Sequence, residues 1–371
     1  MGSNVWIRNK ENNKRKLLNG KRGVILKAAI FNGPQSMEVR DVPPLESNPN
    51  DLVLRVLSCG ICGSDLHSMR TGDFVTPGQI MGHEFVGEVV EVGSNVEGIK
   101  NGDRVVGTSA AFCGECRWCK SGDFIYCPDL FNTAIGYGRP GGFSDFVRIE
   151  NAVLNQTVFH VPEHLSNEEA SLMEPLGVAA LTVSQVHRQS NKRALVIGGG
   201  IIGNLVAQIL KNEHDYDVAI SEPSEIRRNK VYGVTHKINP FEEDLIKRLQ
   251  NIWGEGKYHF GSGGMADLVI DCAGSKQTFI QALEAVRSKG VIGVVALPDQ
   301  PVPVNLMRVV HKAPEIVGVL GSDMGEAIRL VKEDKVTLNT LVTHTYPLKN
   351  ITEAFKVQQN TDASVKVVVN P

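Results

Sequence analysis

Charge of one sign is what this sequence lacks most clearly. Its 39 lysines and arginines are balanced by 41 aspartates and glutamates, which gives a formal net charge of -2. A protein that binds nucleic acid or an anionic membrane by charge usually carries a basic excess. The sequence also has no apolar run as long as a membrane-spanning helix. We therefore expect neither nucleic acid nor a membrane as a partner.

We expect neither a signal peptide nor a disulfide framework in this sequence. The seven cysteines are clustered in a long chain, and this spacing favours metal binding in a reducing compartment. We therefore expect a cytoplasmic protein. At 371 residues the chain exceeds the usual size of one domain, so two domains are expected.

Residues 1–24 carry seven basic side chains against one acidic side chain, with little apolar periodicity. This composition predicts a basic, disordered tail. A basic targeting peptide is the alternative, although serine is scarce and no small-residue cleavage site follows.

The stretch from Cys59 to Glu84 collects side chains that bind metals. It contains CGICGSDLHSM and then GQIMGHEF. Cys62 offers a thiolate, His83 an imidazole and Glu84 a carboxylate, a mixture that suits zinc in a catalytic site. Each of these residues taken alone could be a buried cysteine or a loop-capping histidine.

Four further cysteines follow with the spacing C-x2-C-x2-C-x7-C. They are Cys113, Cys116, Cys119 and Cys127. Four thiolates in so short a span can close a tetrahedron around one zinc ion and leave no position for water or substrate, so a structural site is predicted. An iron–sulfur cluster is the alternative, although its usual last gap is three residues rather than seven.

Short alternating segments surround these clusters. LKAAIF, MEVRDV, LVLRVLS, FVGEVVEVG and DRVVGT predict antiparallel strands. Because helical periodicity is absent here, the first domain is expected to be mostly β and to present its ligands from loops. Ser166 and Glu169 then predict a helix start by a capping box, and Pro175 interrupts the helical pattern that follows.

A dinucleotide-binding motif follows in RALVIGGGIIGNLVAQIL. Gly198, Gly200 and Gly203 stand in G-x-G-x-x-G register between an apolar strand and an apolar helix. A second strand, DVAISE, ends at Glu222, 19 residues after Gly203. An acid at that place accepts hydrogen bonds from the ribose and repels a 2′-phosphate, so NAD is favoured over NADP. Further strands and helices alternate after it, as a doubly wound parallel sheet requires.

GICGSDLH followed by GHEFVGEVVEVG resembles the zinc-dependent medium-chain alcohol dehydrogenase superfamily, in its polyol and threonine dehydrogenase branch. The resemblance covers almost the whole chain after about residue 25. It implies an α/β protein with a GroES-like, mostly β catalytic domain that carries a structural zinc lobe, and a Rossmann domain that binds NAD. The expected boundaries are 25–172 and 318–371 for the catalytic domain and 173–317 for the Rossmann domain.

The resemblance also implies roles for four further residues. Ser64 takes the position of the hydroxyl that carries a proton from the substrate, and His67 that of the histidine that passes it toward solvent. Glu174, in a Glu-Pro motif, would approach the catalytic zinc directly or through water. Arg227 stands where a basic residue reaches the ribose of NAD, although Arg227 and Arg228 could also accommodate a 2′-phosphate.

The function implied is NAD-dependent oxidation of a secondary alcohol to a ketone, in a small polyol, a sugar derivative or a sugar acid. Sorbitol-type members have aromatic residues where this chain has Ser68 and Met69. Oxidation of an amino alcohol, as in L-threonine 3-dehydrogenases, is therefore a near alternative. A catalytically silent protein that binds NAD and zinc is a third reading. Family members are dimers or tetramers, so a homo-oligomer is expected.

Overall fold

The computed structural model describes residues 25–110, 112–190, 192–298 and 300–371, so the predicted basic tail lies outside the described residues. The chain divides into two compact units. The first unit runs to Glu174 and adds His344–Val357 and Val367–Pro371, and the second comprises Pro175–Thr343 and Gln358–Lys366.

The first unit is built on antiparallel strands, as predicted. Strands β1 (Leu26–Gly33) and β2 (Ser36–Val42) form a hairpin-like pair. A seven-stranded sheet has the order β16-β17-β3-β4-β5-β7, with β6 also paired to β3. Its strands are β3 (Leu52–Gly60), β4 (Glu84–Val92), β5 (Arg104–Gly107), β6 (Phe146–Ile149), β7 (Val158–His160), β16 (Val342–Pro347) and β17 (Lys366–Asn370).

Short helices connect these strands. They are α2 (Gly63–Thr71), α3 (Arg117–Ser121), α4 (Leu130–Thr133), α5 (Asn167–Ala170) and α13 (Ile351–Gln359), with single 3-10 turns η1 (Phe124–Tyr126) and η2 (Leu348–Asn350). The capping box predicted at Ser166 and Glu169 is confirmed at the start of α5. The expectation of a mostly β domain is confirmed, but helix α2 forms in a stretch where no helical periodicity was found.

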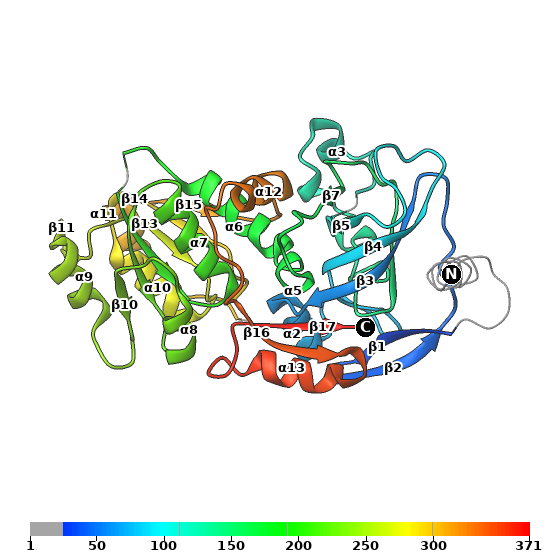
Figure 1. Ribbon diagram of the computed structural model, residues 1–371. Coiled ribbons are helices and arrows are strands. Elements are labelled where there is room, and N and C mark those ends of the chain that lie inside the picture. Colours follow the sequence, from blue (N-terminus) through cyan, green and yellow to red (C-terminus); the bar gives the residue numbers. More distant parts are fainter. Residues whose placement is uncertain (1–24, 111, 191, 299) are drawn as a thin grey trace. The chain divides into compact units, whose positions relative to one another are not determined.

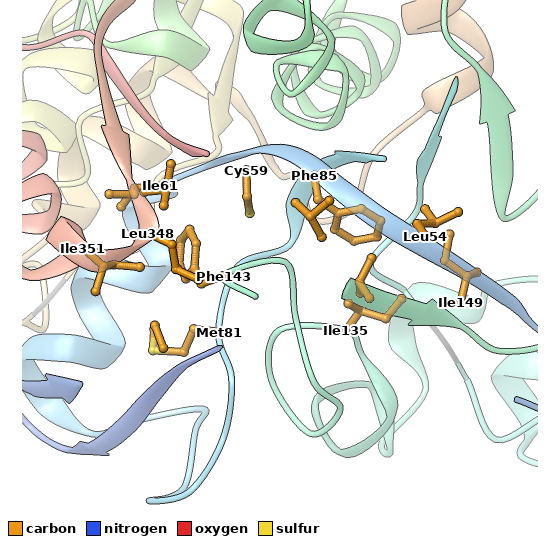
Figure 2. Close-up of a cluster of buried hydrophobic side chains, with 14 of the residues drawn as sticks. Leu54, Cys59, Ile61, Met81, Phe85, Ile135, Phe143, Ile149, Leu348 and Ile351 are labelled. Atoms are coloured by element: carbon orange, nitrogen blue, oxygen red, sulfur yellow. The ribbon is translucent and has the colours of Figure 1, made fainter. Parts of the chain in front are cut away.

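The core of the first unit joins segments that are far apart in the sequence. Figure 2 shows side chains from β3, such as Leu54, in one cluster with Phe85 of β4, with Phe143 and with Ile351 of α13. Each of these four side chains is almost completely buried, and burying a side chain of this size typically contributes about 1.5–3 kcal/mol. The C-terminal segments β16 and β17, orange and red in Figure 1, are thereby fixed to the sheet that contains β3.

The second unit is a parallel sheet of six strands in the order β10-β9-β8-β13-β14-β15. This is the order of a dinucleotide-binding Rossmann sheet, so the predicted fold class is confirmed. Its strands are β8 (Arg193–Ile197), β9 (Asp217–Ser221), β10 (His236–Ile238), β13 (Ala266–Asp271), β14 (Val286–Val294) and β15 (Glu315–Gly318), and a separate pair is formed by β11 (Gly256–Tyr258) and β12 (Gly261–Gly263).

Helices alternate with these strands (Figure 1). They are α6 (Met173–Val186), α7 (Ile201–Asn212), α8 (Glu225–Lys230), α9 (Leu245–Trp253), α10 (Lys276–Ala285), α11 (Leu306–Lys312) and α12 (Met324–Lys332). Pro175 lies in the first turn of α6, where a missing backbone N–H costs no helical hydrogen bond. The helical pattern therefore begins near this proline instead of being interrupted by it.

The chain returns to the first unit later than the expected residue 318. Residues 318–343 belong to the second unit, because α12 and the segment after it are bonded to α6 and α7. The Asp323 N–H donates to the carbonyl of Gly177 at 2.9 Å. Gln208 exchanges two hydrogen bonds with the backbone of Thr337. The chain therefore re-enters the first unit at His344.

Candidate functional site

Cys62 is the N-cap residue of α2, not a residue in the middle of a loop. Its backbone N–H donates to Oδ2 of Asp65 at 2.9 Å, which satisfies one of the donors at the helix start. The helix ends at Gly72, which has φ +85°, a left-handed conformation that glycine adopts without strain. Ser64 and His67 lie three residues apart, so they share one face of this helix.

His83 and Glu84 enter from the beginning of β4. The preceding Gly82 has φ +94°, and a Cβ there would lie 2.9 Å from the sulfur of Cys59, so a larger residue would displace the chain that delivers the histidine. One ligand atom each from Cys62, His83 and Glu84 lies within 4.8 Å of the other two. The three types of donor that the sequence suggested are thus brought to one point.

Negative charge surrounds His83. Burial lowers the pKa of this histidine, but the charges of Asp65, Cys62 and Glu174 outweigh burial and hold the pKa well above its ordinary value. Nδ1 of His83 lies 3.7 Å from Oδ1 of the buried Asp65. A buried cluster of anionic donors is costly unless a cation neutralises it, so the residues present fit a metal ion.

Two further acidic residues, Asp65 and Glu174, influence His83 without belonging to the three-donor set. Asp65 lies beside Nδ1 of His83, and a carboxylate beside one ring nitrogen can orient an imidazole whose other nitrogen binds a metal. Sequence reasoning missed Asp65, although its acidic side chain three residues after Cys62 is a sign of helix capping. Glu174 lies in the first turn of α6 and acts on His83 through its charge.

The two relay candidates have different partners. Tyr137 donates its phenol hydrogen to Oγ of Ser64 at 2.8 Å. Nε2 of His67 lies 3.0 Å from Oδ2 of the exposed Asp73. Burial, followed by the charges of Cys62 and Asp65, raises the pKa of Tyr137 well above its ordinary value, so the phenol stays protonated and can donate.

Aromatic rings reach this region from unexpected positions. Ser68 and Met69, where aromatic residues would indicate a sorbitol-type site, are buried in the first unit. The rings come instead from Phe74, Phe131 and Tyr137, which form a continuous chain of ring contacts from His67 to His83. Sequence reasoning missed all three because they lie in separate segments and share no spacing pattern.

The four cysteines of the second cluster also converge. Sulfur pairs lie 3.5 Å apart for Cys116 and Cys119, 3.6 Å for Cys113 and Cys127, and 3.9 Å for Cys113 and Cys119. A tetrahedron with zinc–sulfur bonds of about 2.3 Å has sulfurs about 3.8 Å apart. All four are free thiols, so the cluster fits one tetrahedral ion and not a pair of disulfides.

Electrostatics differ within this cluster. Hydrogen bonds from the N–H groups of Glu115 and Cys116 lower the pKa of Cys113 to about 7. Burial raises the pKa of Cys119 to about 12. N–H donors of this kind stabilise thiolates, which are the form that binds a metal.

The glycine motif forms the turn from β8 into α7. Gly198 has φ +98°, and a Cβ on Gly203 would lie 1.8 Å from the carbonyl oxygen of Gly198. The turn can therefore close only with glycine at these positions. Glu222 follows β9 and is 4% exposed. Its two carboxylate oxygens accept the N–H groups of Gly199 at 2.6 Å and Ser224 at 2.8 Å, which fixes the acid against the glycine turn.

The two arginines after Glu222 point to different partners. Arg228 donates to the backbone carbonyls of Glu222 and Pro223, so its guanidinium stabilises the strand end. Arg227 donates through Nε to the carbonyl of Ser364 at 2.8 Å, and its Nη1 would lie 3.6 Å from a Cβ on Gly200. Arg227 is thus the arginine that lies over the glycine turn.

Two family models match the chain. Residues 48–163 match the alcohol dehydrogenase GroES-like domain, and residues 202–333 match the zinc-binding dehydrogenase model. Among the residues that the structure describes, no helix is both long enough and apolar enough to cross a membrane.

Curated and solved proteins are similar over nearly the full chain. An L-threonine 3-dehydrogenase of Pyrococcus furiosus is 33% identical over 90% of this chain and 94% of its own length. A sorbitol dehydrogenase of Bacillus subtilis is 28% identical over 93% of this chain and 97% of its own length. The solved structure of 2R,3R-butanediol dehydrogenase from Bacillus subtilis is 26% identical, with a TM-score of 0.81, and the match covers 93% of this chain and 99% of that one.

Proposed function

The chain belongs to the zinc-dependent medium-chain alcohol dehydrogenase superfamily, and we propose that it oxidises a secondary alcohol to a ketone with NAD as hydride acceptor. The substrate class is a small polyol, a sugar derivative or a sugar acid. The observation that carries this proposal is the convergence of Cys62, His83 and Glu84 in the same unit as Ser64 and His67. The enzyme is an NAD(P)-dependent alcohol oxidoreductase, and the particular alcohol and the preference for NAD are our proposals.

Cys62, His83 and Glu84 would hold the catalytic zinc, and Glu174 would approach it directly or through water. A zinc ion there supplies Lewis acidity that lowers the pKa of an alcohol hydroxyl. Ser64 accepts the hydroxyl proton. NAD, when bound, would supply the acceptor for the hydride of the carbon that bears this hydroxyl. His67 passes the proton toward solvent, and its contact with the exposed Asp73 keeps the imidazole near water.

The direct test is to supply the protein with NAD and each alcohol of a panel. Formation of NADH is measured by its absorbance. Sorbitol, 2R,3R-butanediol and L-threonine are taken from the names of the similar proteins, and L-idonate adds a sugar acid. We expect reduction of NAD with at least one secondary alcohol of the polyol or sugar-acid type. If no alcohol is oxidised with either cofactor by zinc-loaded protein, the catalytically silent alternative replaces this proposal.

A second candidate is oxidation of an amino alcohol, as by an L-threonine 3-dehydrogenase. It is favoured by the relatives that are 33% identical over 90% of the chain. The two candidates separate in the same panel, because an amino-alcohol enzyme has a higher kcat/KM for L-threonine than for any polyol.

We predict two zinc ions per chain, because the mixed donor set and the four-cysteine set share no residue. Elemental analysis of purified protein measures this. Cys113→Ser should lose one equivalent, Cys62→Ser should lose the other, and Cys272→Ser, a cysteine of neither set, should retain both. Iron in place of zinc, accompanied by visible colour, would contradict the structural zinc assignment.

We also propose a homo-oligomer, a dimer or a tetramer. Strand β15 lies at the edge of the six-stranded sheet, and an unpaired strand edge is a surface for pairing with another chain. On α11, Leu306, Met307 and Val310 are 62–72% exposed. A second copy that covers these side chains would remove apolar area from water.

Light scattering after gel filtration measures the oligomer, and Val310→Lys should shift it toward monomer. Phe241→Lys is the matched control, since Phe241 is 85% exposed elsewhere in the second unit. A monomeric wild type at micromolar concentration would refute the oligomer.

We further propose a cytoplasmic location, because all seven cysteines are free thiols and free thiols persist in reducing compartments.

A further inference from the structure

Tyr137 is a polar group in contact with Ser64 that the proposed reaction leaves without a role. Its phenol O–H donates to Oγ of Ser64 at 2.8 Å, across 73 positions of sequence. Such a bond between distant segments exists only because the fold brings them together. The contact is therefore a feature of the assembled site and not of either segment.

The ring of Tyr137 is held on two sides. It stacks on the imidazole of His83 with centroids 5.1 Å apart and planes at 30°. It meets Phe131 edge-on, at 5.5 Å and 78°. A ring fixed in this way has little freedom to turn, so its hydroxyl is directed at Ser64 without further loss of side-chain entropy.

The hydrogen-bonding capacity of Ser64 decides what this contact does. A serine hydroxyl has one hydrogen to donate and two lone pairs that accept. Tyr137 occupies one lone pair, so the other is left to accept the proton of the substrate hydroxyl. The hydrogen of Ser64 must then point to the next proton acceptor.

We propose that Tyr137 is a positioning residue, whose phenol fixes the Ser64 hydroxyl in the orientation that receives the substrate proton on one lone pair and releases its own hydrogen to the relay. The proposal rests on the proposed function. In the step, the substrate O–H bond breaks and a new O–H bond forms on Ser64. The hydrogen that Ser64 carried moves on, and the phenol hydrogen stays on Tyr137. The hydride passes to the nicotinamide, so the atoms and charges balance.

The test is Tyr137→Phe, which keeps the ring and its two aromatic contacts and removes only the hydroxyl. We expect kcat to fall roughly three- to tenfold, as loss of one orienting hydrogen bond implies. Zinc content and NADH affinity should not change. Tyr346→Phe is the matched control, because Tyr346 is also a partly buried tyrosine packed on the core of the first unit, and it should keep full turnover.

A double-mutant cycle separates positioning from direct contact with substrate. If Tyr137 acts through Ser64, Tyr137→Phe should have no further effect on kcat in a Ser64→Ala background. An equal loss in both backgrounds would mean that the phenol contacts substrate directly, and it would overturn the proposal. Full turnover of the single variant Tyr137→Phe would overturn it as well.

Thermal unfolding gives a readout that does not depend on activity. The hydrogen bond predicts that Ser64→Ala and Tyr137→Phe lower Tm non-additively, with a coupling of about 2–4 °C. Strictly additive shifts would show that the bond does not form. An inactive wild type with this coupling intact would refute the proposed function and leave the bond established, so the two failures are distinguishable.

Discussion

Ser64→Ala is expected to lower kcat by on the order of a hundredfold or more, because it removes a positioned proton carrier from the reacting hydroxyl. The loss should fall on turnover and not on cofactor binding, since the glycine turn that would bind NAD lies in the other unit. The measurements are kcat, NADH affinity and zinc content on one preparation. His67→Ala should be milder, because water can replace a relay member that is open to solvent.

Ser68→Ala is the matched control for this variant. Ser68 lies on the same helix, is fully buried, and its hydroxyl has no hydrogen-bond partner among the described residues. Removing such a hydroxyl should be nearly neutral. Loss of zinc together with activity in Ser64→Ala would indicate that the serine only supports the metal site. Full activity in Ser64→Ala would mean that another residue carries the proton.

The second large effect concerns the cofactor. We expect kcat/KM with NAD to exceed that with NADP by on the order of a hundredfold, because placing a 2′-phosphate beside an anionic carboxylate costs several kcal/mol. Glu222 is held in place by the N–H groups of Gly199 and Ser224, so it cannot easily turn away from the phosphate. Steady-state kinetics with both cofactors measures the ratio.

Glu222→Gln should reduce this preference, since it removes the charge and keeps a side chain of the same size. Glu225→Gln is the control, because it removes the same charge from an exposed position in the first turn of α8. It should leave the ratio unchanged. Equal or better efficiency of the wild type with NADP would show that Arg227 outweighs the acid.

Local patterns were sufficient for much of the fold. The alternating segments around β3, β4 and β5 predicted antiparallel strands, and the apolar strand before Gly198 predicted β8. These predictions succeeded because side-chain periodicity and glycine requirements act over a few residues. Helix α2 was missed because it is short and polar, and its stability comes from the contact between Cys62 and Asp65 and from tertiary packing.

In the candidate site, too, some features could be predicted from the sequence and others depend on the fold. The donor types of Cys62, His83 and Glu84 and the spacing of the four cysteines could be taken from the sequence, since ligand chemistry is a property of the residues themselves. The roles of Asp65 and Tyr137 could not. Each depends on a side chain that the fold brings against another segment, as Asp65 lies against His83 and Tyr137 against Ser64.

The sequence by itself determined the fold class, the kinds of metal ligand and the glycine turn with Glu222. Each of these features depends on patterns of residues that are close together along the chain. Only the tertiary structure decided where the chain leaves the second unit, since hydrogen bonds from α12 and Thr337 to α6 and α7 hold residues 318–343 there. It also decided which groups face Ser64 and His83. Long-range contacts follow from how the apolar faces pack, and no short pattern in a single sequence specifies that packing.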